Sequence, residues 1–185
     1  MDKSSERRSE ALSPLTRHHH HALVIALNLR RAGSNETYSF NRVQQDLKEF
    51  WQEGGQDHFQ QEEEILLPLF SRFASLEQDD IIRMLLQHVQ IRAAVSLLLN
   101  NPEATVDIMH HLGELLADHV HLEENRVFPM IEQAIPEEEL HQLTFHQGIT
   151  ETDRSFSHAR EDRARQAQRD NSRLDSDTNE GSSET

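Results

Sequence analysis

The chain has 185 residues, which is the length of one domain of ordinary size with short extensions. Its 18 Lys and Arg stand against 33 Asp and Glu, and the formal net charge of −15 excludes the basic surface that nucleic-acid binding needs. The lack of cysteine excludes a disulfide framework, a thiol nucleophile and an iron–sulfur cluster. Histidine is abundant, with 13 copies beside one Trp and one Tyr, and this composition indicates metal or proton chemistry.

From the sequence we expect no targeting or membrane segment. Its longest uninterrupted apolar run, residues 22–27, is far shorter than the ~20 residues that a membrane span requires. The first ten residues also lack the apolar core of a signal peptide. We therefore expect a cytoplasmic protein with no membrane partner.

The two ends of the chain differ in composition from its middle. From Ser157 onward the only large aliphatic residue is Leu174, so this segment buries too little apolar surface to offset the entropy of ordering it. The first residues are similarly polar. We expect residues 1–13 and 157–185 to be disordered and residues 14–156, which carry nearly all the excess of acidic groups, to form one domain.

The domain is predicted to be all-α, because Gly and Pro are scarce and no run alternates apolar and polar residues as strands do. The first expected helix begins at Pro14 and ends near Gly33. The next three span about residues 39–74, 78–99 and 104–134, and a short fifth helix runs from Pro136 to about Phe156. Gly54 and Gly55 are expected to bend the second helix. Four long amphipathic helices with short connections predict an up-down-up-down four-helix bundle.

An internal repeat carries the chemistry. Residues 58–68 read HFQQEEEILLP and residues 119–129 read HVHLEENRVFP, so that His, Glu-Glu and Pro recur 61 positions apart. Residues four apart lie on one face of a helix, with Cβ atoms ~5–6 Å apart. Each copy therefore presents an imidazole beside a carboxylate on an apolar face, as the pairs His58/Glu62 and His119/Glu123.

Two glutamates that face one core predict a bound cation. A buried carboxylate is costly unless it is paired or coordinates a metal, and Glu62 and Glu123 would repel each other without a cation between them. Carboxylates that bridge two metal ions satisfy this requirement. Mixed His and carboxylate ligands with open positions suit non-haem iron better than a closed zinc site.

The other two helices supply further histidines. His88 lies on the apolar stripe of the third helix and is expected to point inward. On the first helix the run 18–21 is HHHH, and a helical wheel places His19 nearest the apolar centre. His18 and His20 flank that centre, with His20 as the main alternative ligand, and His21 is expected to face outward.

For the other residues that the two copies of the repeat share, we expect structural roles. Glu63 and Glu124 lie about 140° from the face of the HxxxE pairs, at ~100° per residue, so we expect them to be solvated or salt-bridged. Pro68 and Pro129 each delete one helical hydrogen bond and are expected to kink their helices below the site.

Histidine on the first and third helices, with HFxxEE and HxxxEE on the second and fourth, resembles the hemerythrin-like (HHE) cation-binding domain over about residues 14–135. The resemblance implies a four-helix bundle that holds a non-haem di-iron centre of two iron ions, bridged by the HxxxE glutamates. The ligands it implies are His19, His58, Glu62, His88, His119 and Glu123. Animal oxygen carriers have a second histidine where this chain has Arg92 and an aspartate where it has Glu124, so the sequence is closer to the bacterial type.

Four histidines and two glutamates leave coordination positions of two irons open. We expect a small ligand such as O2, NO or peroxide to bind there, so that the protein binds or senses it. The alternatives are a di-iron enzyme acting on peroxide, NO or ferrous iron, and an iron-storage or buffering protein. No separate acid or base is evident in the sequence, so binding is preferred to catalysis.

Overall fold

A computed structural model describes residues 9–143 and residue 145. The expected disordered segments therefore lie outside the described residues, except for residues 9–13. Those residues correct the expectation, because Glu10–Leu12 forms a short 3-10 helix (η1) and Leu12 is fully buried. The apolar side chain of Leu12 packs into the bundle, so the ordered part begins before Pro14.

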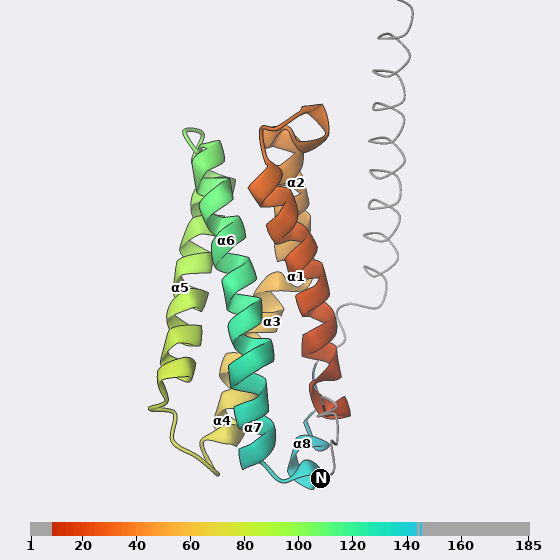
Figure 1. The fold of residues 1–185 in the computed structure, drawn as a ribbon, viewed down its shortest axis with the longest axis vertical. Coiled ribbons are helices and arrows are strands. Elements are labelled where there is room, and N and C mark those ends of the chain that lie inside the picture. Colours follow the sequence, from red (N-terminus) through yellow and green to blue (C-terminus); the bar gives the residue numbers. More distant parts are fainter. Residues whose placement is uncertain (1–8, 144, 146–185) are drawn as a thin grey trace, which may run out of the picture. The chain divides into compact units, whose positions relative to one another are not determined.

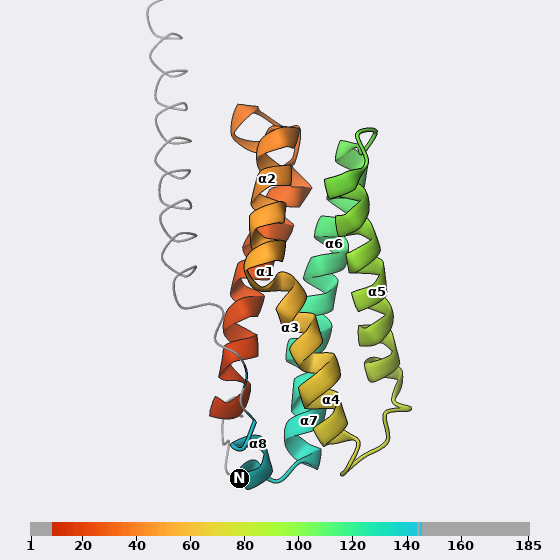
Figure 2. The ribbon, with the colours of Figure 1, turned by 180° about the vertical axis from the view of Figure 1, so that it is seen from behind.

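The described residues form four helical arms that run up, down, up and down, as the sequence predicted (Figure 1). The first arm is α1 (Ser13–Arg31), and a loop with η2 (Glu36–Tyr38) leads to the second. The second arm comprises α2 (Phe40–Phe50), η3 (Trp51–Gly55), α3 (Gln56–Gln61), η4 (Glu62–Leu66) and α4 (Leu67–Phe70). The third is α5 (Asp79–Asn100), and the fourth is α6 (Val106–Leu122), η5 (Glu123–Val127) and α7 (Phe128–Ala134). Helix α1 lies beside α2 and α6, and α5 lies beside α2 and α6 (Figure 2).

The fifth helix is much shorter than predicted. Helix α8 (Glu137–Leu140) ends in a turn at His141 and Gln142. Leu140 and Phe145 are both buried in the same apolar cluster, whereas five residues of helix would set them about 140° apart, at ~100° per residue. The chain leaves the helix so that both side chains can pack; the rest of the predicted helix lies outside the described residues.

Three turns of π-helix interrupt the second and fourth arms. In η4 the Leu67 amide donates to the Glu62 carbonyl, and in η5 the Phe128 amide donates to the Glu123 carbonyl, five residues back. Pro68 and Pro129 follow directly, and a proline ring clashes with the carbonyl four residues before it. The widened turns thus stand where we predicted kinks, and each begins at a glutamate of an HxxxE pair.

The third π-helical turn, η3, contains the bend that the sequence predicted. Gly54 there has φ 167° and ψ −14°, which departs from helical geometry, while the chain re-enters the helix at Gly55. The bend separates α2 from α3, which carries the buried His58.

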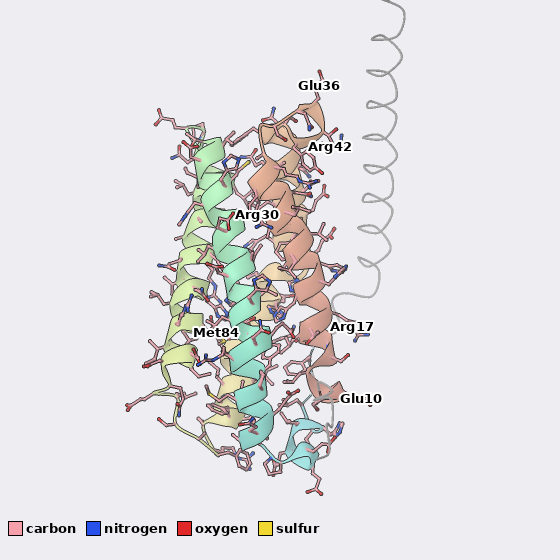
Figure 3. The ribbon with its side chains drawn as sticks, viewed as in Figure 1. Glu10, Arg17, Arg30, Glu36, Arg42 and Met84 are labelled. Carbon is pink, nitrogen blue, oxygen red and sulfur yellow. The ribbon has the colours of Figure 1, made fainter. Side chains whose placement is uncertain are left out.

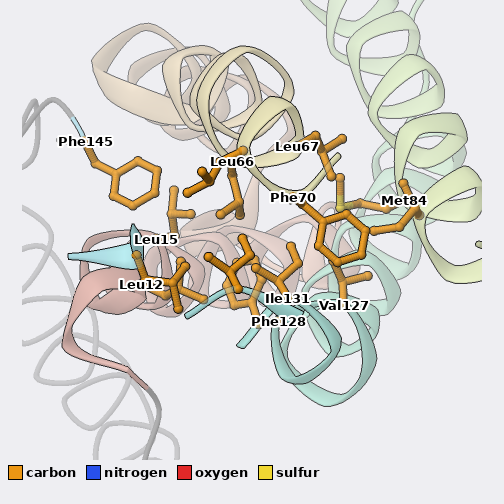
Figure 4. Packing of buried hydrophobic residues seen from close by; sticks show 14 of the residues in the cluster. Leu12, Leu15, Leu66, Leu67, Phe70, Met84, Val127, Phe128, Ile131 and Phe145 are labelled. Carbon is orange, nitrogen blue, oxygen red and sulfur yellow. The ribbon is translucent and has the colours of Figure 1, made fainter. Parts of the chain in front are cut away.

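Apolar side chains from all four arms fill the end of the bundle near α4, α7 and α8. Figure 4 shows Phe70, Met84 and Val127 converging there, with Leu12 of η1 and Leu15 of α1 beside Phe128. Charged side chains such as Arg17 and Arg42 project from the surface of the bundle (Figure 3). Among the described helices only α5 is long and apolar enough to cross a bilayer by length and composition, but its Ile81 and Met84 are core residues.

Helix α1 packs closely against α6 at Gly113. A Cβ atom placed there would lie 2.8 Å from the Ala26 carbonyl oxygen and 3.1 Å from the Arg30 amide nitrogen, so the backbones of α1 and α6 would have to separate. We expect Gly113→Ala to destabilise the protein by about 1–3 kcal/mol, the usual cost of overpacking. Thermal unfolding measures the effect. The matched control Asp118→Ala, at an exposed position of the same helix, should change the melting temperature little, and an equal loss in both variants would contradict this packing.

Candidate metal centre

The six residues predicted as ligands meet in the middle of the bundle. They come from all four arms: His19 from α1, His58 from α3, Glu62 from η4, His88 from α5, His119 from α6 and Glu123 from η5. Each is at most 3% exposed, and both glutamates are fully buried. The repeat in sequence therefore folds into one internal cluster of four imidazoles and two carboxylates.

The cluster divides into two groups of four that share both glutamates. The first group is His19, His58, Glu62 and Glu123, and the second is Glu62, His88, His119 and Glu123. Within each group the candidate ligand atoms all lie within 4.8 Å of one another. Such an arrangement can hold two cations, each facing two imidazoles, with the two carboxylates between them.

The histidine nitrogens point at the shared carboxylates. His19 Nε2 lies 2.8 Å from Glu123 Oε2, and His119 Nε2 lies 3.1 Å from Glu123 Oε1. Glu62 receives the other two, with His58 Nε2 3.3 Å from Oε1 and His88 Nε2 3.3 Å from Oε2. The four imidazoles are thus oriented from four helices toward one small volume.

Most of these atoms have no hydrogen bond within the described residues. All four carboxylate oxygens of Glu62 and Glu123 are buried without one, as are Nε2 of His88 and of His119. Leaving one buried polar group unsatisfied costs about 1–3 kcal/mol, and more for a charged group. Cations between these oxygens and nitrogens would satisfy all of them at once, so the donor set fits a metal.

Comparison with known families gives the same answer. Residues 12–131 match the model of the hemerythrin family, described as the hemerythrin HHE cation binding domain. The chain belongs to this hemerythrin family. No curated protein and no solved structure matches the chain in the other two comparisons. The family and the buried His/Glu cluster together show a cation-binding domain.

The two shared carboxylates of this hemerythrin domain differ in their electrostatics. Burial raises the pKa of Glu62, and the neighbouring Glu123 carboxylate raises it further, to about 7. Burial also opposes the ionisation of Glu123, but its contacts with His119, His19 and His88 hold its pKa well below the usual range. Like charges this close do not both ionise freely, so without a cation the pair tends to keep one proton near neutral pH.

The four imidazoles also fall into two kinds. Burial lowers the pKa of His19 and of His88, but contacts with glutamates outweigh it and raise the two values to about 9 and about 10. Burial and nearby imidazoles lower the pKa of His58 well below its usual value, and burial lowers that of His119 to about 4. A cation would therefore displace a proton from His19 and from His88. His58 and His119 are already neutral and would have no proton to lose.

The second glutamate of each repeat reaches across to a histidine on another helix. Glu63 Oε1 lies 2.7 Å from His88 Nδ1, and Glu124 Oε1 lies 2.6 Å from His19 Nδ1. Arg92 also donates to both oxygens of Glu63, at 2.8 and 3.0 Å. The prediction of a salt bridge is therefore confirmed for Glu63, but the contacts with His88 and His19 were not predicted.

These contacts orient the inward-facing nitrogens of hemerythrin-type histidines. A carboxylate that accepts from Nδ1–H leaves Nε2 free to bind a metal and makes the imidazole a stronger donor. Gln87 lies in the same relation to His119, with Oε1 3.4 Å from Nδ1. The doubled Glu in each repeat was the signal in the sequence that could have indicated these contacts. Helical geometry alone, however, does not show which helix the second Glu faces.

The four consecutive histidines separate differently from the helical-wheel prediction. His19 joins the cluster as predicted, whereas His20, the main alternative, is exposed. His18 is buried and stacks on His58, with ring centroids 4.5 Å apart, and on Phe50. His21 is 8% exposed rather than facing outward, because α1 packs against both α2 and α6 and so buries a wider arc than one stripe.

A small internal cavity adjoins the first group of ligands. Its volume is about 10 Å³, near the room that one water-sized molecule needs. Three of the clustered histidines and His18 line it, and most of the remaining wall is aromatic or aliphatic: Phe50, Trp51, Phe59, Leu116 and Val120. The cavity is suited to a small molecule of low polarity beside His58 and His119.

Proposed function

We propose that this hemerythrin-family protein binds two non-haem iron ions. His19 and His58 would hold one ion, His88 and His119 would hold the other, and Glu62 and Glu123 would bridge them. The observation that carries this proposal is the pair of four-residue groups that share both glutamates, with the carboxylate oxygens buried without a hydrogen bond among the described residues. Imidazole and carboxylate ligands together are typical of non-haem iron, and the domain offers no cysteine to favour a thiolate metal.

We further propose that the site binds or senses a small ligand such as O2 or NO. Two histidines and two shared carboxylates leave each iron with open positions, and a bound iron pair would supply the electrons and the vacant coordination that such ligands need. The cavity beside His58 and His119 is about the size of one water, and the aromatic and aliphatic part of its walls favours an uncharged molecule. Glu63, Glu124 and Gln87 keep the imidazole Nε2 atoms directed inward.

The metal content tests the first half of the proposal. Protein expressed in iron-rich medium is expected to contain two irons per chain, because the two groups of ligands are both complete. Elemental analysis with an optical spectrum of the aerobic protein measures this, and an oxygen-bridged ferric pair should give ligand-to-metal absorption. One tightly bound zinc per chain, with no iron, would contradict the di-iron site.

The ligand is tested on the same preparation. Anaerobic, reduced protein should change its spectrum with saturable dependence on NO or O2. The variant Leu116→Trp tests whether the ligand binds in the cavity, because the larger side chain would fill the space next to His119. We expect this variant to keep its iron but to bind the small ligand more weakly; iron that responds equally in both proteins would show that the cavity has no part in binding.

A further inference from the structure

A cleft opens on the outside of the bundle, between α2, η3 and α5. Its volume is about 550 Å³, within the range of small-molecule sites. Lys48 of α2, Trp51 and Gln52 of η3, and Arg92 and Ser96 of α5 line its walls. The second arm bends at Gly54, and the cleft is lined on both sides of this bend, by Gln52 before it and by Gln56 after it.

The lining of the cleft is unlike the rest of the chain in charge. None of the lining residues is acidic, although 33 of the 185 residues are Asp or Glu. The two charged residues are Lys48 and Arg92, and the amide side chains of Gln44, Gln45, Gln52, Gln56 and Asn100 add hydrogen-bonding groups. Lys48 is exposed and makes no ion pair within the described residues. A positive, amide-lined cleft on an acidic protein favours a small anion.

Arg92 joins this cleft to the metal centre. Its guanidinium group donates two hydrogen bonds to Glu63, whose Oε1 also contacts His88 Nδ1 at 2.7 Å. The guanidinium carbon lies 5.4 Å from the centre of the Phe59 ring, and that ring stacks on His88 with centroids 4.0 Å apart. Arg92 is therefore two contacts away from an inward-facing imidazole while 35% of its side chain stays exposed.

The first helix cannot form the same connection. Arg92 follows His88 by four residues, whereas the residue four positions after His19 is Leu23, which cannot bind a carboxylate. The contact of Glu124 with His19 thus has no arginine at the matching place.

We propose that the cleft is a binding site for a small carboxylate or phosphate anion, held between Lys48 and Arg92, and that Arg92 transmits its occupancy to the metal centre through Glu63. A bound anion competes with Glu63 for the guanidinium N–H groups. Glu63 then accepts more strongly from His88, which makes His88 a better donor to the metal. This second step rests on the proposed di-iron function, whereas the anion site itself does not.

Trp51 allows the site to be tested directly, because it is the only tryptophan in the chain and it lines the cleft. The protein is titrated with inorganic phosphate and, separately, with malonate, and its fluorescence is followed. We expect a saturable change with at least one of them, and the comparison shows whether phosphate or carboxylate is preferred.

Lys48→Gln should weaken binding about tenfold, as expected when a charge partner is lost. Arg83→Gln, an exposed arginine of α5 outside the cleft, should leave binding unchanged.

The coupling is tested by the reduction potential of the iron-loaded protein. At an anion concentration near the wild-type Kd, the potential should fall in the wild type and fall much less in Lys48→Gln, whose side chain does not touch Glu63. No saturable fluorescence change, or equal weakening by Lys48→Gln and Arg83→Gln, would overturn the anion site. Anion binding without a shift of the potential would overturn the coupling alone. If the protein binds no iron, the proposed function is wrong. The fluorescence titration still tests whether the cleft binds an anion.

Discussion

Replacing Glu62 with alanine is expected to abolish the binding of both metal ions rather than of one. Glu62 belongs to both groups of ligands, with Oε1 facing His58 and Oε2 facing His88 at 3.3 Å each. In the proposed two-metal site its loss would remove a ligand from each ion and the negative charge between them. Glu123→Ala should have the same effect, because Glu123 is the other shared residue. Elemental analysis of the purified variants measures the loss.

The neighbouring glutamates supply matched controls on the same helical turn. Glu64 is exposed and accepts a hydrogen bond from Gln60, so Glu64→Ala should keep two metals. Glu63 contacts His88 without facing the centre, and Glu63→Gln should lower affinity by about 10–100-fold, the usual effect of losing such an outer partner. The expected order of damage is therefore Glu62, then Glu63, then Glu64. Retention of both ions by Glu62→Ala, or equal loss in all three variants, would contradict the shared-carboxylate site.

The sequence predicted the bundle and the six clustered residues because both depend on helical periodicity. The repeat at His58 and His119 places each imidazole beside a carboxylate whatever the details of packing. The choice of His19 also followed from periodicity, since it lies at the centre of the apolar face of α1. These features need only a regular helix.

The parts that sequence reasoning missed depend on contacts between helices. Whether Glu124 of η5 reaches His19 is set by the rotation of the fourth arm against α1, which no local pattern encodes. His21 is buried because α1 touches two neighbours rather than one. The π-helical turns were likewise missed: Pro68 and Pro129 indicated a disturbance, but a widened turn and a kink relieve the same clash.

Removal of the metal is expected to make stability depend on pH. Without a cation, contacts with glutamates raise the pKa of His19 to about 9 and that of His88 to about 10, against an ordinary value of 6.5. Above pH 7 the folded protein then holds protons that the unfolded chain has released. The stabilisation from these two groups is complete below pH 6.5 and is lost as pH rises through 9 and 10, by roughly 1–3 kcal/mol per pH unit at most.

Bound metal should remove this dependence. Ligation takes the place of both protons, so neither the loaded protein nor the unfolded chain titrates at these histidines between pH 7 and pH 9. The melting temperature of metal-free protein should therefore fall between pH 7 and pH 9, while that of loaded protein should stay nearly level. At a fixed metal concentration, the stabilisation by metal should accordingly grow with pH, from about 2.7 kcal/mol if that concentration is a hundredfold above Kd at pH 7.

Variants at the outer contacts assign the effect to particular residues. Glu124→Gln removes a charge that raises the pKa of His19, so the metal-free protein should lose less stability between pH 7 and pH 9. His20→Gln changes the exposed neighbour of His19 and should leave the trend as in the wild type. Melting temperatures of metal-free and loaded protein at pH 7, 8 and 9 measure all three. A metal-free melting temperature that rises over this range would show that His19 and His88 are neutral in the empty cluster, because only charged imidazoles lose a folding-linked proton there.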